Sequence, residues 1–102
     1  MQFTILRSDR KEVVKMVEKK KISQEELEKM NVKSWPIWEC EPSTFDWEYN
    51  EDERCYFLEG SVTVKTPEGE INIEAGDFVK FPKGLKCVWQ VHEKVRKHYK
   101  LG

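Results

Sequence analysis

The side chains that could carry chemistry gather in the second half of the chain, around Glu53 and Cys87. Burial of a glutamate among aromatic side chains raises the pKa of the carboxyl group, which suits a general acid or base. A cysteine beside a positive group can act as a nucleophile or as a soft metal ligand. We therefore predict Glu53 and Cys87 as catalytic residues. The alternatives are a carboxylate held structurally by a neighbouring tyrosine or arginine, and a cysteine that only fills apolar space.

Aromatic residues surround these two candidates. Residues two apart on a strand share a face, so Cys55 lies on the face of Glu53 and Trp89 on the face of Cys87. An apolar pocket with one or two polar groups is typical of a site for a small molecule. In the alternative interpretation, the same side chains only pack a core. The residues that we predict to bind a small polar ligand are Trp47, Tyr49, Cys55 and Trp89.

The supply of metal ligands is poor. Zinc sites take three or four ligands from His, Cys and carboxylate side chains, and oxygenase centres use imidazole. The chain has two histidines, His92 and His98. Since Glu53 and Cys87 make two candidate ligands, we predict no metal and no other cofactor. The alternative is an atypical metal held through these two residues.

Charge and composition limit the classes of function. The 102 residues include 18 basic and 19 acidic ones, for a net charge of -1, whereas a nucleic-acid-binding surface normally has a basic excess. There is no apolar run of about 18 residues that could span a membrane, and the first residues lack the apolar region of a secretory signal. Three cysteines without a C-x-x-C pair indicate reduced thiols. We expect a cytoplasmic protein that binds neither nucleic acid nor a membrane.

The elements that position the candidate residues change character near residue 35. The residues before position 35 are rich in lysine and glutamate, and their pattern predicts one or two short helices. Ser23 and Glu26 form a capping box for one helix. A second candidate helix is Lys11–Lys20, with Asp9 as its cap, and Gln2–Leu6 is a candidate strand.

From Trp35 onward, apolar residues recur with a period of two, which is typical of strands with one buried face. Turn sequences such as Thr66-Pro67-Glu68-Gly69 separate them. We predict six or seven short strands, within 44–49, 54–58, 61–65, 71–73, 78–81, 87–91 and 95–99. Such strands favour an antiparallel sandwich or barrel. We expect one structural domain, with a helical and edge segment at 1–34 and a β-barrel at 35–102.

The order of glycines and prolines is more specific. In EDERCYFLEG, six residues separate Glu53 from Gly60, and in GDFVKFPKG one residue separates Pro82 from the final Gly84. In these two motifs the chain from Trp35 to Tyr99 resembles the cupin superfamily of RmlC-like proteins. The phrases WPIWEC, ERCYFLEG, FPKGLKCVW and VRKHY are similar to small single-domain cupins related to the ethanolamine-utilisation cupin and, more distantly, to ureidoglycine aminohydrolase. The resemblance implies a mainly β fold, a single jelly-roll-like antiparallel barrel, and a homodimer.

The same resemblance bears on the metal. In metal-binding cupins the first motif supplies two histidines and a glutamate, and the second motif supplies a third histidine. Here Trp47-x-Tyr49 or Asp46-x-Glu48 stands at the paired positions, and Cys87 stands at the third. Among the standard ligands only Glu53 is present, which agrees with a cupin that lacks the His-rich metal centre.

Three functions therefore follow from the sequence. The first is a small-molecule-binding cupin-fold protein without that metal centre. The second is a small enzyme that uses Glu53 as general acid or base, with an atypical metal or Cys87. The third is a non-catalytic dimeric interaction or regulatory protein that binds through its charged N-terminal helices.

Overall fold

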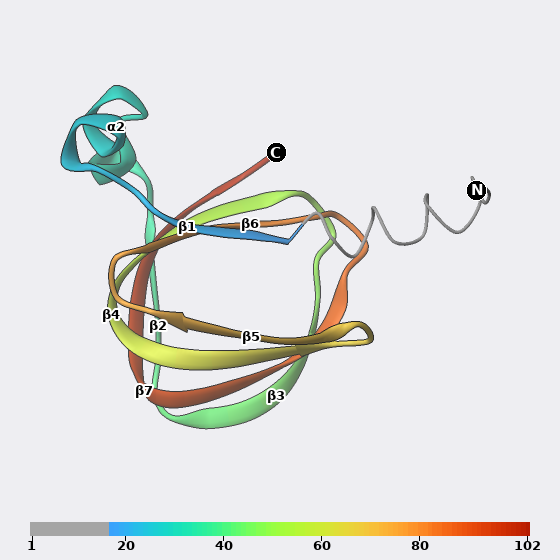
Figure 1. The fold of residues 1–102 in the computed structure, drawn as a ribbon. Helices are drawn as coiled ribbons and strands as arrows, with labels where there is room; N and C mark the ends of the chain where they lie inside the picture. The colour runs from blue at the N-terminus through green and yellow to red at the C-terminus, as the bar shows by residue number, and fades with distance from the viewer. Residues whose placement is uncertain (1–16) are drawn as a thin grey trace, which may run out of the picture.

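Two long antiparallel strands, β4 (Glu53–Thr66) and β7 (Lys86–Leu101), form the frame of the fold (Figure 1). The structure, a computed structural model, describes residues 17–102. The two strands pair from Glu53 opposite Leu101 to Lys65 opposite Val88. Together with shorter strands they build a seven-stranded antiparallel sheet, which confirms the predicted mainly β fold.

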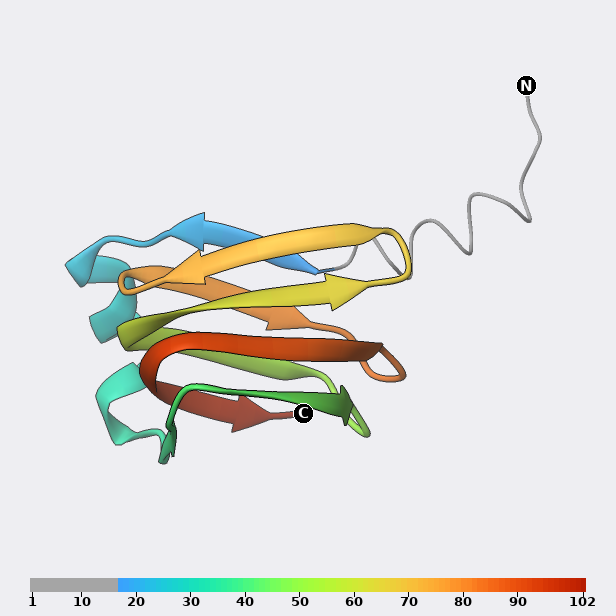
Figure 2. The same cartoon turned by 90° about the horizontal axis from the view of Figure 1, so that it is seen from below.

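Shorter strands extend each half of this central pair, and the sheet folds into two layers (Figure 2). In one layer, β6 (Asp77–Phe81) pairs with the first part of β4, β1 (Glu18–Lys21) pairs with β6, and β2 (Ile37–Cys40) pairs with the last part of β7. In the other layer, β5 (Gly69–Glu74) pairs with the second part of β4, and β3 (Ser43–Glu48) with the first part of β7. The result is a jelly-roll-like barrel.

The long strands pass from one layer to the other through a shared bend, which Figure 2 shows at one end of the barrel. The register between β4 and β7 shifts three times between Phe57 and Val62, and such bulges bend a strand. Gly60 lies in this segment with a φ of 96°, and a Cβ atom there would collide with the backbone of Lys94 on β7. A glycine is therefore required where the two backbones approach each other.

The main core lies between the layers. It is built from inward side chains that alternate along β4, β6 and β7, as the period of two predicts. Its fully buried members include Cys55, Phe57, Val62, Val64, Val79, Phe81 and Val95, and Trp89 lies among them.

A short helical segment precedes the barrel. Helix α2 (Gln24–Lys29) begins after Ser23, whose hydroxyl oxygen accepts a hydrogen bond from the backbone N–H of Glu26, and the predicted Ser23 cap is confirmed. A 3-10 helix, η1 (Val32–Ser34), follows. This segment packs on the outside of β6 through a small apolar cluster of Leu27, Val32, Trp35 and Phe78.

Several predicted boundaries differ from the structure. Gln2–Leu6, Asp9 and the first part of the Lys11–Lys20 helix lie outside the described residues. The prediction is wrong for the last part of that helix, because Glu18–Lys21 forms strand β1. The edge of β6 offers backbone hydrogen-bond partners there, and these outweigh the helix propensity of the residues. The strands predicted at 54–58 and 61–65 are one strand, as are those at 87–91 and 95–99, because the chain stays paired through the bend. Within residues 17–102, no helix is long and apolar enough to cross a membrane.

The close approach at the bend predicts different tolerance at two glycines. Gly84 also has a positive φ, of 89°, but a Cβ atom there would meet nothing within 4 Å. Gly84→Ala should therefore cost only the backbone strain of about 1–2 kcal/mol. Gly60→Ala should cost about 1–3 kcal/mol more, from overpacking against β7. Urea unfolding of both variants measures the difference, and equal losses would contradict the close approach.

Candidate functional site

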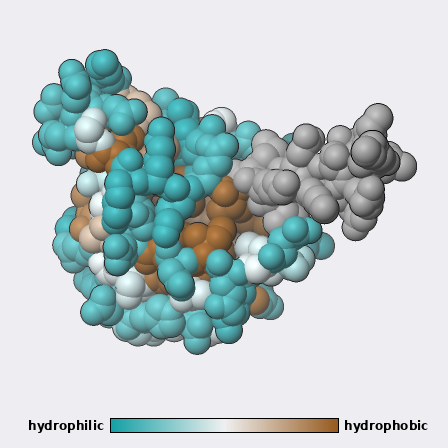
Figure 3. All heavy atoms as spheres, viewed as in Figure 1, coloured by the Kyte–Doolittle hydropathy of each residue, from teal (hydrophilic) through white to brown (hydrophobic). Residues whose placement is uncertain are grey.

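A pocket of about 210 Å³ opens into the barrel core. Seven of its nine lining residues are aromatic or aliphatic, namely Trp38, Phe45, Trp47, Tyr49, Trp89, Tyr99 and Leu101, and the other two are Glu53 and Lys97. Trp47 and Leu101 are about half exposed, at 47% and 50%, and form part of the mouth. On the face of the barrel seen in Figure 3, hydrophobic side chains are visible inside a rim of hydrophilic ones.

The polar part of the pocket is an ion pair between β4 and β7. Lys97 Nζ lies 2.8 Å from Oε2 of Glu53 and 3.3 Å from Sγ of Cys55. The Cys55 thiol donates in turn to Oε2 of Glu53, at 2.9 Å. Lys97 is only 5% exposed, so its charge is compensated within the protein rather than by water.

Aromatic rings surround the same ammonium group. Lys97 Nζ lies 4.7 Å from the ring centroid of Trp89 and 4.9 Å from that of Trp38. The ring of Phe57 is 5.8 Å away. A cation over aromatic faces at such distances is stabilised by the ring quadrupoles, the more so when desolvated. The rings therefore hold Lys97 in its charged form inside an apolar wall.

The protonation states follow from these contacts. Burial alone lowers the pKa of Lys97, but the charge of Glu53 and the hydrogen bonds to Glu53 and Cys55 outweigh it and raise that pKa above the usual value. Burial raises the pKa of the Cys55 thiol far above its usual value. At neutral pH the Cys55 thiol is therefore protonated and the Lys97 side chain is an ammonium.

A second polar contact fixes the aromatic wall of the pocket. This wall consists of Trp38, Phe45, Trp47, Tyr49, Trp89 and Tyr99. The indole N–H of Trp89 donates to the hydroxyl of Tyr49 at 3.2 Å. The Tyr49 ring stacks on Phe81, with centroids 4.7 Å apart and an angle of 9° between the planes. Burial raises the pKa of Tyr49 far above its usual value, so the phenol is neutral and can donate a hydrogen bond.

Strand register explains why these groups meet. On β4, Glu53, Cys55 and Phe57 alternate with outward residues. The pairing sets Cys55 opposite Tyr99 and Phe57 opposite Lys97. Lys97 is also the register partner of Trp38 on β2. The two strands that pair with this part of β7, β4 and β2, thus position the ammonium of Lys97.

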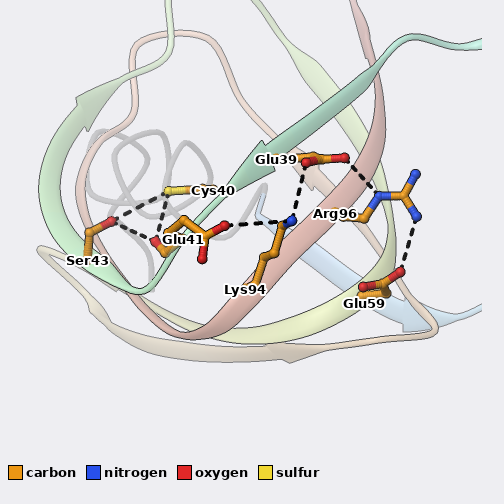
Figure 4. A network of polar contacts seen from close by, with 7 residues as sticks. All are labelled: Glu39, Cys40, Glu41, Ser43, Glu59, Lys94 and Arg96. Carbon is orange, nitrogen blue, oxygen red and sulfur yellow. Dashed lines mark hydrogen bonds and ion pairs between the residues drawn. The ribbon is translucent and has the colours of Figure 1, made fainter.

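Arg96, which is next to Lys97 on β7, and Lys94 face outward and belong to a charge network (Figure 4). Arg96 donates to Glu39 on β2 at 3.0 Å and to Glu59 on β4 at 3.1 Å. Lys94 lies 3.6 Å from Glu39 and also from Glu41. The network joins β2, β7 and β4 on the outside of the barrel.

The structure brings together most of the predicted site. Glu53, Trp47, Tyr49 and Trp89 line the pocket, and Cys55 supports Glu53 from within the core. The partners of Glu53 are a lysine and a cysteine rather than the tyrosine or arginine of the alternative interpretation.

Cys87 is not brought to this pocket. It pairs with Trp47 across β3 and β7 and lines a separate, more open pocket beside the β4–β5 hairpin. Burial raises the pKa of its thiol to about 11, so the thiol is protonated at neutral pH. The roles predicted for Cys87 and for the ligand-binding residues remain predictions.

The sequence interpretation missed five residues of the pocket lining, namely Trp38, Phe45, Lys97, Tyr99 and Leu101. Of these, Lys97 is the one that carries a charge. Counting in twos along the last strand from Val95 through Lys97 to Tyr99 places the lysine on the inward face. Lysine is among the residues that are least often buried without a partner. That inward parity was the available signal, but it pointed to no partner, because Glu53 is distant in the sequence.

Comparison with known proteins defines the family. A model of the EutQ-like cupin domain matches residues 27–99. The chain belongs to the EutQ-like cupin family. The motifs that resemble cupins in the sequence, with Glu53, Gly60 and Gly84, lie inside the matched range, and that expectation is confirmed.

Solved structures agree with this assignment. This EutQ-like cupin is similar to a DUF861 family protein from Thermotoga maritima, with 53% identity, a TM-score of 0.82, and coverage of 84% of this chain and 99% of that one. It is also similar to the Clostridium difficile EutQ protein, at 26% identity and a TM-score of 0.59, over 81% of this chain and 64% of that one. The chain thus spans less than two thirds of that EutQ protein. No curated protein matches the sequence.

The donor set does not fit the metal centre of metal-binding cupins. Within residues 17–102, no group of three or more His, Cys, Asp or Glu side chains is placed to hold a metal ion. Glu53 already shares Oε2 with the ammonium of Lys97, and a divalent cation there would be repelled by that charge. The positive charge beside the Glu53 carboxylate is thus that of Lys97. The absence of a cofactor itself remains a prediction.

The buried pair predicts a large loss on removing one partner. Lys97→Met leaves the Glu53 carboxylate buried without a counter-charge and should lower the free energy of unfolding by about 3–5 kcal/mol. The double variant Lys97→Met with Glu53→Gln should recover part of this loss. Arg96→Met, on the outward face of the same strand, is the matched control and should cost much less. Denaturant unfolding of the four proteins would contradict the pairing if Lys97→Met and Arg96→Met were equally stable.

The raised pKa of Lys97 sets the pH at which its contribution disappears. An ammonium whose pKa is higher in the folded chain stabilises it fully below the unfolded pKa of 10.5. The contribution is lost as the pH rises through the higher folded pKa. The stability difference between the wild type and Lys97→Met should therefore be constant from pH 7 to about pH 10 and shrink above it. A difference that already shrinks near pH 8 would show that the pKa is lowered instead.

Proposed function

We propose that this EutQ-like cupin binds a small organic molecule in the pocket formed by the aromatic wall, Glu53 and Lys97. The observation that carries the proposal is an ion pair exposed to an otherwise apolar pocket. A buried ion pair is weak evidence for stability, because well-packed apolar residues often stabilise a core as well or better. Its position in the pocket wall, where it can contact a ligand, favours recognition as its role.

The size and walls of the pocket support the same function. A volume of about 210 Å³ is below the usual range of about 300–1,000 Å³ for drug-sized ligands, so the ligand is a small metabolite. The side chains of the wall contact one another: Phe45 and Trp89 stack with their centroids 6.1 Å apart, and Tyr49 contacts Trp89 and Phe81. A preformed wall lowers the ordering cost of binding.

Acid–base catalysis is the second candidate function, and the geometry of Glu53 favours it. The carboxylate lines the pocket and has the Lys97 ammonium beside it, so a proton acceptor and a proton donor face the same space. Tyr49 adds a neutral phenol to the same wall. Catalysis of this kind would require the binding proposed here and would add turnover that Glu53→Gln abolishes.

Binding in this pocket can be tested with two exposed apolar residues. Leu101 lines the pocket and is 50% exposed, whereas Ile37 is 44% exposed and lies on the edge strand β2, outside the lining. A ligand-detected NMR screen of small fragments should find binders of the wild type. Leu101→Trp adds bulk at the mouth and should weaken them at least tenfold, and Ile37→Trp should leave them unchanged. The proposal fails if no fragment binds, or if the two variants affect the binders equally.

A further inference from the structure

The charge balance of the pocket restricts its ligand. Glu53 and Lys97 are the charged residues among its lining, and they neutralise each other at 2.8 Å. A charged ligand would leave water for a mostly aromatic space in which no charge is free to pair with it, and this desolvation is costly. Resting on the proposed function, we infer that the ligand is a neutral molecule whose head group carries a hydrogen-bond donor beside an acceptor, as a carboxamide does.

The free hydrogen-bonding capacity of the pair fits such a head group. Oε2 of Glu53 accepts from both Lys97 and Cys55, whereas Oε1 makes no hydrogen bond within residues 17–102. An ammonium has three N–H groups, and two of those on Lys97 are directed to Glu53 and Cys55. One acceptor and one donor therefore remain on adjacent groups.

A carboxamide satisfies both groups at once. Its N–H donates to Oε1 of Glu53, and its carbonyl oxygen accepts from Lys97. A carboxylate has acceptors alone and would face the Glu53 carboxylate, and an amidinium has donors alone and would face the Lys97 ammonium. Each charged analogue thus loses one hydrogen bond and gains a like-charge contact.

The rest of the pocket selects the body of the ligand. Phe45 and Trp89 present nearly parallel rings, at an angle of 20°, and Trp47 meets Phe45 edge-on at 86°. Flat apolar bodies pack well against such rings by stacked and edge contacts. A volume of about 210 Å³ holds a single ring with a small head group. Benzamide is therefore the simplest probe of the inferred class.

Three probes of one shape test the inference. Benzamide, benzoate and benzamidine differ chiefly in charge, and their dissociation constants at pH 7 can be measured by ligand-detected NMR or by tryptophan fluorescence. The latter is informative because Trp38, Trp47 and Trp89 line the pocket. Benzamide should bind at least tenfold more tightly than either ion. The inference is overturned if an ion binds as tightly as benzamide, or if benzamide does not bind at millimolar concentration.

Two substitutions should change the preference in opposite directions. Glu53→Gln leaves the Lys97 charge unpaired, so benzoate should become the tightest of the three probes. Lys97→Met leaves the Glu53 charge unpaired and should favour benzamidine. Arg96→Met, on the outward face beside Lys97, should keep the wild-type order. If Lys97→Met does not fold, Glu53→Gln decides alone, and an unchanged order in that variant refutes the inference.

The outcomes also separate this inference from the proposed function. Fragments that are lost in Leu101→Trp but retained in Ile37→Trp, together with no preference for benzamide, would leave a binding pocket whose ligand class is different. A screen without any binder would remove the binding function and this inference with it.

Discussion

The ion pair between Glu53 and Lys97 is the contact on which the interior of this barrel depends. Its two members are 44 residues apart in the sequence, on the two strands that frame the fold, and Lys97 Nζ lies 2.8 Å from Oε2 of Glu53. Neither charge could be placed alone in this apolar space without a large desolvation cost. Cys55 on one strand and the rings of Trp38 and Trp89 then complete the surroundings of the pair.

The pair also changes the chemistry that a cupin barrel offers. A divalent metal supplies a strong positive charge and open coordination positions. A lysine ammonium supplies one positive charge, three hydrogen-bond donors and no coordination positions. In this EutQ-like cupin, the polar group in the pocket wall is an ion pair of the chain's own side chains, and the binding that we propose would use hydrogen bonds to that pair rather than Lewis acidity.

The sequence was sufficient for the fold and for half of the site. The alternation of apolar residues predicted antiparallel strands, because alternation is a local property of a strand. The spacing of Gly60, Pro82 and Gly84 carried the resemblance to cupins, which implied a single barrel. Glu53 and its aromatic neighbours followed from the same patterns. Lys97 did not, because its meaning comes from a partner 44 residues away. The strand β1 was missed for the same reason: its identity depends on the edge of β6.

The alternation along β7 has a consequence for how this barrel can change during evolution. Lys97 contacts the pocket while its neighbour Arg96 joins three strands on the outside. An insertion or deletion of one residue within β7 would exchange the two faces and place the wrong cation on each side. Changes in length are therefore confined to turns such as 67–68, where the hairpin can grow without moving either strand. Divergence of the family should accumulate by substitution in the strands and by changes of length in the loops.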